Sequence, residues 1–158
     1  MEYFETIIWY GDNEPHFAEG EGIISYLAQQ DKKMILSSVS LMNPNNDSLY
    51  QFLPIDTVTH YNILRVMPGT EIISLADDMN HLQVDKLLSY VNGFEVNPSA
   101  GEALYRLPEG DRYWEGTPVI ALRTPKENPS LYFFNFYLHK TQADKTYEML
   151  NKILGSKK

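Results

Sequence analysis

The chain contains no cysteine. This absence excludes disulfide bonds, thiolate catalysis, and zinc or iron–sulfur sites that are built on cysteine. Small secreted domains often depend on disulfides, so we expect a cytoplasmic protein. A basic region followed by an apolar stretch, as in a signal peptide, is missing from the N-terminal residues. No apolar run approaches the roughly 20 residues that a membrane-spanning helix requires.

Positive charge is also scarce. The chain has 13 Lys and Arg residues against 21 Asp and Glu residues, a formal net charge of −8. This balance argues against binding to nucleic acids or anionic membranes, because phosphate contacts need clustered cations. The excess is local, since residues 1–31 hold seven acids and no Lys or Arg. A concentrated negative segment favours a basic protein partner.

Length and composition are those of a single globular domain covering residues 1–158. The hydrophobic fraction is 43% and the charged fraction 22%, within the range of folded proteins. A chain of this size buries roughly two-thirds of its unfolded surface and needs no covalent staple. Nothing in the composition fixes an oligomeric state.

Local patterns predict several strands interrupted by helices. Runs rich in β-branched and aromatic residues predict strands at 3–10, 33–42, 55–67, 71–75, 103–107, 118–124 and 131–139. Helices are expected at 17–30, at 80–93 and at 141–154.

After the break at Pro68-Gly69, the strand 71–75 would be the hairpin partner of 55–67. Residues 80–93 have the clearest helical pattern. They combine a capping Asn80, an apolar stripe and a closing Gly93; the stripe consists of Val84, Leu87, Leu88 and Val91.

In the last helix, Thr141 would provide the cap, and Ala143, Tyr147, Leu150 and Leu154 would pack on the sheet. The fold class predicted from this order is α+β, with a mainly antiparallel sheet of five to six strands and about three helices packed on it.

No motif identifies a reaction. The chain has no GxSxG elbow, no phosphate-cradling glycine loop, and no HExxH or calcium-loop pattern. We therefore predict no catalytic residues, no metal site and no cofactor. The nearest candidate ligands are Asp77, Asp78 and His81, which are more simply explained as a charged helical first turn. A small enzyme with a site assembled from His60 and these three residues remains an alternative.

Two segments combine aromatic and acidic residues, as protein interfaces do at their hot spots. One runs from Trp9 to Glu21 and the other from Glu109 to Gly116. The candidate partner-binding residues are Trp9, Tyr10, Asp12, Glu14, Glu19, Glu21, Asp111, Tyr113 and Trp114. The alternative is that Trp9 belongs to the core and Trp114 covers a sheet edge. Strand alternation places Trp9 and Tyr10 on opposite faces.

Three stretches in the second half carry a resemblance: LLSYVNGFEVNPSAGEAL at 87–104, TPVIALRTP at 117–125 and LYFFNFYLHKTQADKTYEML at 131–150. Over roughly residues 80–154 the chain resembles suppressor-of-fused-like domains, especially the short bacterial, immunity-type members. That family has a helix ending in an aromatic turn, a glycine-containing loop, a strand ending near proline, and a strand feeding a final helix. Its usual tryptophan before the middle helix is absent here. The resemblance implies a binding domain without catalytic residues.

Together these features favour a non-enzymatic protein-binding domain. The leading hypothesis is a bacterial immunity protein or inhibitor that binds a basic partner through an acidic, aromatic-containing surface. A secretion or assembly chaperone, which has a similar order of elements, is the second hypothesis, and it would show an exposed apolar groove. An ordinary solubilising surface is the alternative explanation of the acidic segment.

Overall fold

A computed structural model describes residues 4–10, 25–29, 31–39, 53–110 and 112–155. These residues form strands β1 (Thr6–Tyr10), β2 (Lys33–Ser37), β3 (Ile55–Ile63), β4 (Glu71–Ser74), β5 (Leu82–Gln83), β6 (Val91–Val96), β7 (Glu102–Arg106), β8 (Val119–Thr124) and β9 (Leu131–Phe134). A short 3-10 helix, η1 (Leu138–Lys140), precedes the helix α3 (Ala143–Gly155). One helical turn lies at 25–27. No helix of the described residues is long and apolar enough to span a membrane.

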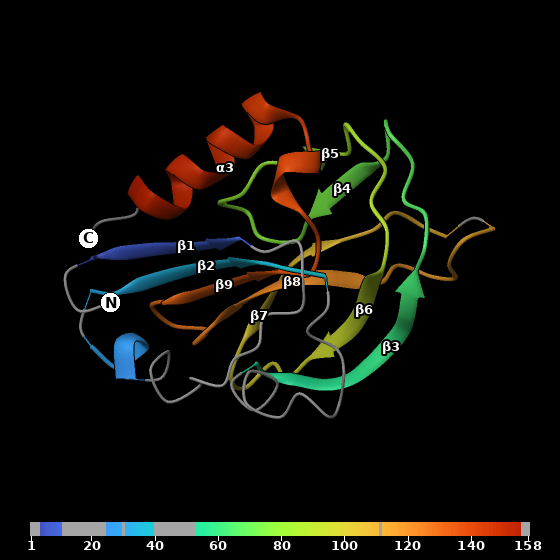
Figure 1. The fold of residues 1–158 in the computed structure, drawn as a ribbon. Coiled ribbons are helices and arrows are strands. Elements are labelled where there is room, and N and C mark those ends of the chain that lie inside the picture. The colour runs from blue at the N-terminus through green and yellow to red at the C-terminus, as the bar shows by residue number, and fades with distance from the viewer. Residues whose placement is uncertain (1–3, 11–24, 30, 40–52, 111, 156–158) are drawn as a thin grey trace.

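The strands form one curled, mixed sheet (Figure 1). Its main path runs β1-β2-β9-β8-β7-β4-β5, and β3 joins through β6, which also contacts β8. The pairs β1–β2 and β2–β9 are parallel, whereas the pairs β3–β6, β4–β5, β4–β7, β6–β8, β7–β8 and β8–β9 are antiparallel. The three parallel strands therefore end along the same edge of the sheet.

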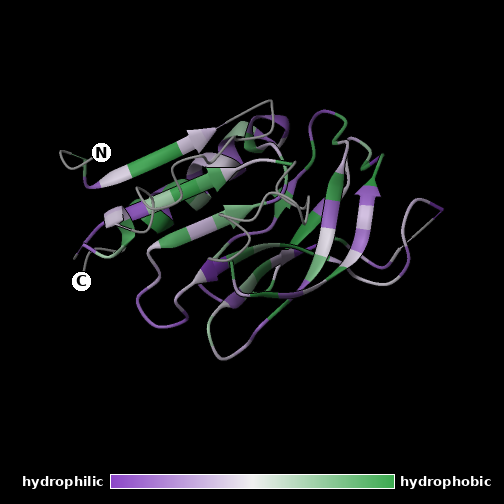
Figure 2. Cartoon of the chain, turned by 60° about the horizontal axis from the view of Figure 1, so that its bottom comes forward, coloured by the Kyte–Doolittle hydropathy of each residue, from purple (hydrophilic) through white to green (hydrophobic). Residues whose placement is uncertain are grey.

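Apolar residues on both faces of the central strands explain why these strands lie in the interior. β9 is buried at all four positions and β2 at its last four, as is typical of strands covered on both faces. In Figure 2 the two strands at the right, β3 and β6, instead mix hydrophobic with hydrophilic colour. In β3 the exposed Thr57, Thr59 and Tyr61 alternate with the partly buried Val58 and His60, as in a strand with one solvent-exposed face.

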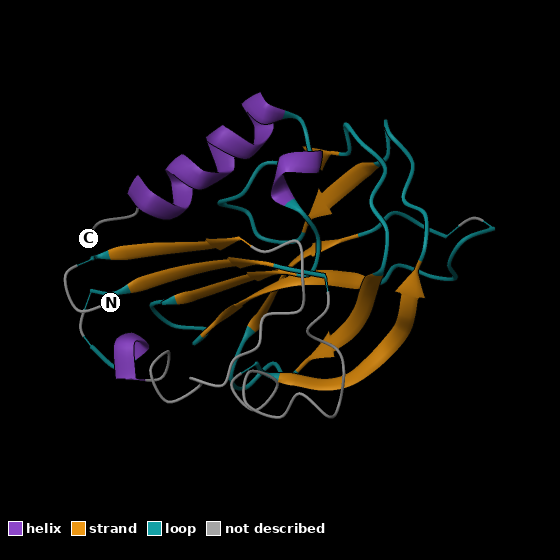
Figure 3. Cartoon of the chain, in the orientation of Figure 1, coloured by secondary structure: helices purple, strands orange, loops and turns teal. Residues whose placement is uncertain are grey.

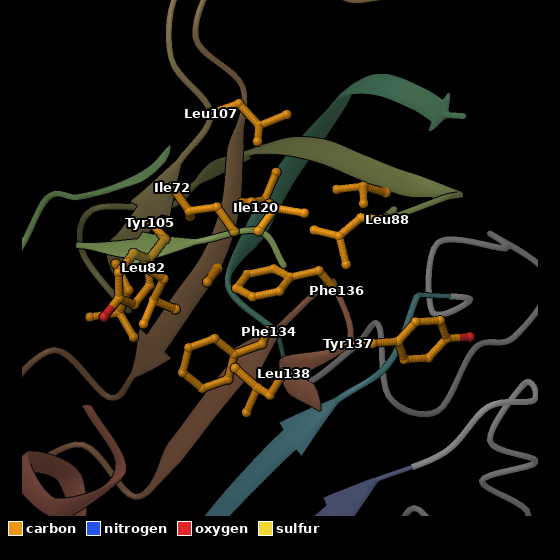
Figure 4. Close-up of a cluster of buried hydrophobic side chains, with 14 of the residues drawn as sticks. Ile72, Leu82, Leu88, Tyr105, Leu107, Ile120, Phe134, Phe136, Tyr137 and Leu138 are labelled. Carbon is orange, nitrogen blue, oxygen red and sulfur yellow. The ribbon is translucent and has the colours of Figure 1, made fainter. Parts of the chain in front are cut away.

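Two hydrophobic cores flank the sheet. The helix-side core includes Phe134, Phe136 and Tyr105 together with Met149 and Ile153 of α3, and Figure 4 shows part of it. The far-side core lies on the opposite face and includes Met34, Leu36, Phe94, Leu122 and Phe133, with Tyr26 from the helical turn at 25–27. Alternation along β9 sends Phe133 to one core and Phe134 to the other.

The predicted fold class is wrong. The sheet is mixed and larger than predicted, and among the described residues only α3 has seven or more helical residues (Figure 3). The parallel pairing was missed because it joins segments that are distant in sequence. The connection from β1 to β2 is long enough for a parallel return, which needs about a dozen residues, and β9 comes roughly a hundred residues after β2. Most of the helix predicted at 17–30 lies outside the described residues.

The helix predicted at 80–93 is also wrong. This segment contains β5, the start of β6 and two isolated bridges, at Val84 and Leu88. Its backbone donors are used by other parts of the chain, since the Asp85 and Lys86 amides both donate to the Lys140 carbonyl. Tyr90 has a φ of 62°, which no right-handed helix accommodates. Apolar spacing alone did not distinguish a helix from irregular extended chain, because both can bury the same residues.

Gly93 does not terminate a helix. It lies within β6, where a Cβ atom would approach Pro118 Cβ to 2.5 Å and the His60 ring to 3.1 Å. The glycine therefore permits close contact between β6 and its neighbours. The predicted hairpin of 55–67 with 71–75 is wrong as well: β3 pairs with β6, whereas β4 pairs with β5 and β7.

The final helix forms as predicted, but a different face packs on the sheet. Met149 and Ile153 are buried and Leu150 is partly buried, whereas Tyr147 is 68% exposed. The Thr141 hydroxyl donates to the Leu138 carbonyl and so braces the turn before the helix. The prediction chose the face that contains Ala143 and Tyr147, whereas the buried face contains Met149 and Ile153.

Three buried tyrosines with raised pKa values predict that the protein unfolds cooperatively at alkaline pH. Burial raises the pKa of Tyr26, Tyr105 and Tyr132 above the ordinary 10.0, and for Tyr105 the carboxylates of Asp78 and Glu148 raise it further. Because the folded pKa exceeds the unfolded pKa, the stability from these groups is complete below about pH 10 and is lost as the pH rises through the folded pKa. We expect phenolate absorbance to appear in two phases, the later one coinciding with loss of far-ultraviolet circular dichroism. A single phase over all eleven tyrosines with unchanged dichroism would contradict this.

Candidate functional site

The carboxyl ends of β1, β2 and β9 meet at one edge of the sheet. Tyr10 pairs in register with Ser37, which in turn pairs with Phe134. In sheets with parallel strands, ligands commonly bind beyond the carboxyl ends, where the loops emerge. We define the carboxyl edge as Tyr10, Ser37, Ser38, Asn135, Tyr137 and His139, and treat it as the candidate functional site.

Two aromatic rings, those of Tyr10 and His139, are exposed at the carboxyl edge, and the Tyr137 ring beside them is only 9% exposed. The Tyr10 ring is 5.0 Å from the His139 ring in an edge-to-face arrangement and 6.4 Å from the Tyr137 ring, centroid to centroid. The Tyr10 hydroxyl and His139 Nδ1 share a hydrogen bond. Tyr10 is nevertheless 45% exposed, so a partner could contact a ring that its neighbours already hold in place.

Tyr137 and His139 are positioned by a turn that follows β9. The Ser37 hydroxyl donates to the Phe136 carbonyl at 2.8 Å and accepts from the Leu138 amide at 3.2 Å. Figure 4 shows Tyr137 pointing away from Phe134 and Phe136. Lys140 Nζ lies 5.0 Å from the Tyr137 ring centroid. One serine of β2 thus fixes the turn that carries two rings of the site.

A buried amide pair ties β9 to β6 and β3 behind this turn. Asn135 Nδ2 donates to the Asn92 carbonyl at 2.8 Å. Asn92 Oδ1 accepts from the Asn62 amide at 2.7 Å, and Asn62 has a φ of 52°. Both amide side chains are almost completely buried. These bonds hold the ends of β3, β6 and β9 in a fixed relation.

In the first predicted partner-binding segment, the structure describes Trp9 and Tyr10. Trp9 is partly buried and packs against the far-side core, whereas Tyr10 is exposed on the other face of β1. The opposite orientation predicted from strand alternation is confirmed. The alternative that Trp9 belongs to the core is met only in part, since Trp9 packs against the far-side core and is itself partly buried. Asp12, Glu14, Glu19 and Glu21 lie outside the described residues.

In the second predicted partner-binding segment, the tryptophan is part of the hydrophobic core. Trp114 is only 7% exposed, belongs to the helix-side core, and donates from Nε1 to the Pro108 carbonyl at 3.1 Å. Tyr113 packs partly against the same core, and the Arg112 guanidinium lies 4.7 Å from its ring. Asp111 lies outside the described residues. Trp114 is therefore not an exposed anchor, and because Trp9 packs on the opposite face, the two tryptophans do not form one surface.

Sequence reasoning missed Tyr137 and His139. Residues 137–139 of the run YLHK were assigned to the end of the strand 131–139, and Lys140 to the connection before the following helix. It contains the aromatic and basic residues of an interface, but it comes close to Tyr10 only through the parallel pairing of β1, β2 and β9. No periodicity along the sequence indicates that pairing.

Three residues of the alternative enzyme site, His60, His81 and Asp78, each bind a different part of the chain. His60 Nε2 contacts the Glu115 carbonyl at 2.8 Å, whereas His81 Nδ1 accepts from the Ser74 amide at 2.9 Å. Asp78 instead pairs with Arg123, which also binds Glu102. No group of three or more His, Asp or Glu residues within the described chain could hold a metal ion.

An open depression borders Asp78. Glu148, Asn151, Lys152 and Gly155 of α3 complete its lining. Neither His60 nor His81 contributes to it. The arrangement offers ion pairing at the surface of α3, and it brings no general base against a nucleophile.

A second exposed surface lies far from the carboxyl edge in sequence. Val66 and Leu88 form an antiparallel bridge in the same register as Ile63 and Val91. Around these four buried residues, several large apolar side chains are exposed: Leu64 at 56%, Met67 at 45%, Leu87 at 41% and Tyr90 at 59%. We call these four the apolar ribbon. Exposed apolar groups in such proximity are typical of interaction surfaces.

Comparison with known proteins identified no relative. No protein-family model matches the chain, and neither the curated proteins nor the solved structures contain a match.

Proposed function

We propose that this protein is a non-enzymatic protein-binding domain, and specifically a bacterial immunity protein or inhibitor of a basic partner protein. The observation that supports the proposal most directly is the exposed Tyr10 ring, braced by Tyr137 and His139 at the carboxyl edge. Directly after Tyr10 the sequence continues into Asp12, Glu14, Glu19 and Glu21. An aromatic anchor and a run of carboxylates are thus adjacent in the chain.

The two parts would contribute differently to binding. A tyrosine that is already held in one orientation loses little conformational entropy on association, and tyrosine is enriched among residues that dominate binding energy. The carboxylates would steer a basic partner toward the site and accelerate association, an effect that falls with salt. Toxins that attack nucleic acids need basic surfaces around their active sites, which makes them partners of suitable chemistry.

The resemblance to suppressor-of-fused-like domains is a further support, and it also implies binding without catalysis. Its later part agrees with the strand, turn, strand and helix found between Val119 and Gly155. Its first part does not, since residues 87–93 contain an isolated bridge, a bend and the start of β6 where the family has a helix. The absence of cysteine supports a cytoplasmic location for the complex.

We expect two variants to weaken binding in different ways. Tyr10→Ala should leave the association rate unchanged and increase the dissociation rate. Neutralising four acids to Asn or Gln should lower the association rate and make it less dependent on salt. These acids are Asp12, Glu14, Glu19 and Glu21. The partner would be isolated from the source organism at low salt with the intact chain, and its binding to each variant measured by surface plasmon resonance. Loss of about tenfold or more in affinity is expected for Tyr10→Ala, as for an interface hot spot.

Matched controls remove the same groups elsewhere. Tyr147→Ala deletes an aromatic ring that is 68% exposed on α3. A second control neutralises four exposed acids, Asp56, Asp85, Glu127 and Asp144. If the controls weaken binding as much as the test variants, the site is misplaced. If no protein is retained at low salt, the proposed function is wrong.

The apolar ribbon favours one other function, a secretion or assembly chaperone. Such a protein binds apolar segments of its clients, and Leu64, Met67, Leu87 and Tyr90 would provide a suitable surface. The two functions differ in which surface matters. A partner lost on Leu64→Ser and Leu87→Ser but retained by Tyr10→Ala would favour the chaperone.

A further inference from the structure

Two buried polar atoms of the carboxyl edge have no hydrogen-bond partner among the residues that the structure describes. They are Ser38 Oγ and Asn135 Oδ1. Ser38 is 1% exposed and Asn135 is 0% exposed, so bulk solvent does not reach either of them. Burying such an atom unpaired costs on the order of 1–3 kcal/mol, and buried polar groups without protein partners commonly bind an ordered water.

The register of the sheet places the two side chains together. Ser37 and Phe134 are the last paired residues of β2 and β9, and the Ser38 amide continues the ladder by donating to the Phe134 carbonyl at 3.0 Å. Ser38 and Asn135 are the next residues of the two strands. Strand alternation puts Ser38 on the far-side face, after Met34 and Leu36, and puts Asn135 on that face after Phe133.

The location also offers a third polar group. A serine side chain is much shorter than the Met34 and Leu36 side chains that precede it on the same face, which favours a small molecule beside Asn135. Asn92 adjoins both residues, since Asn135 Nδ2 donates to the Asn92 main-chain carbonyl and Asn92 Nδ2 reaches the carbonyl of Val39, the residue after Ser38. This contact with the Val39 carbonyl is long, at 3.5 Å, which leaves a donor that a third molecule can use. Buried waters typically make about three hydrogen bonds.

We propose that Ser38 Oγ and Asn135 Oδ1 hold one buried water molecule, with Asn92 Nδ2 as its third partner. The water donates to the Asn135 oxygen, exchanges a hydrogen bond with the Ser38 hydroxyl and accepts from the Asn92 amide. It joins the ends of β2, β9 and β6 directly behind the turn that carries Tyr137 and His139. The site is structural, and it does not depend on the proposed partner.

The test is made on the unmodified chain. A crystal structure at about 1.5 Å should show one solvent peak within hydrogen-bond distance of both atoms. Water-selective NMR should show a cross-relaxation signal between a long-lived water and the Asn135 side-chain amide protons. A dry site in which Ser38 Oγ bonds directly to Asn135 Oδ1 would overturn the proposal, as would a solvent peak bonded to neither atom.

Two serine variants separate this water from general damage to the fold. Ser38→Ala removes one of its partners and should abolish the cross-relaxation signal or shorten the water's residence. Ser37→Ala is the matched control, because that neighbouring hydroxyl is already bonded to Phe136 and Leu138, and the signal should persist. Equal loss in both variants would contradict the assignment.

Discussion

Phe134→Ala should lower the free energy of unfolding by about 3–5 kcal/mol, the cost of deleting a buried aromatic ring and leaving a cavity. Phe134 is 0% exposed, and its ring centroid lies 6.0 Å from that of Tyr105 and 5.7 Å from that of Phe136. β9 is held by β2 on one side and β8 on the other, so the backbone has little freedom to collapse into the space. The loss would be measured by urea denaturation followed by far-ultraviolet circular dichroism.

Phe4→Ala is the matched control for this prediction. It makes the same chemical change at a side chain that is 62% exposed, so its effect should stay within about 0.5 kcal/mol. The slope of unfolding free energy against urea should be the same in both variants. Similar losses at the two positions would contradict the placement of Phe134 in the helix-side core.

Trp114→Ala should destabilise the protein by a similar amount, about 3–5 kcal/mol. Its indole packs in the helix-side core and donates to the Pro108 carbonyl. The loop around it is compact, because a Cβ atom on Gly110 would lie 2.1 Å from the Trp114 carbonyl oxygen. Trp114→Phe should recover most of the loss and retain a deficit of about 1 kcal/mol for the missing hydrogen bond.

Trp114 was predicted from the sequence as a partner-binding residue, and its variants distinguish a role in the core from a role in binding. If Trp114 is core, folded Trp114→Phe protein should bind the partner as the intact chain does. Tyr147→Ala, which removes an exposed ring, should change neither stability nor binding. A Trp114→Phe variant that is fully folded under the assay conditions and still binds the partner poorly would show that Trp114 belongs to the interface.

Particular residues show how far the sequence could be interpreted. Strands with their own β-branched or aromatic runs, such as β1 and β8, were predicted closely, because their local pattern and tertiary environment agree. The helix prediction for residues 80–93 was wrong because backbone groups of this segment form hydrogen bonds with Thr70, Lys140 and Val66. Those contacts are nonlocal, and they outweigh a local helical pattern that is a weak determinant by itself.

In the candidate site, too, some residues could be predicted from the sequence and others could not. The sequence identified Tyr10 and its alternation with Trp9, since both follow from the period of a strand. It did not identify Tyr137 and His139, because the parallel pairing of β1, β2 and β9 brings them to Tyr10 from the other end of the chain. It also ranked Trp114 with the interface residues, since an aromatic in a polar segment has the same local signature whether it points outward or inward.

Composition and local pattern by themselves determined the absence of cysteine chemistry, the local excess of acids in residues 1–31 and most of the strands. Only the tertiary structure decided which strands pair, which face of α3 is buried and which aromatic rings meet at the carboxyl edge. The physical reason is that charge and strand period are properties of consecutive residues. Strand pairing and burial depend on contacts between residues far apart in the chain, and their free energy is gained only when the sheet is assembled.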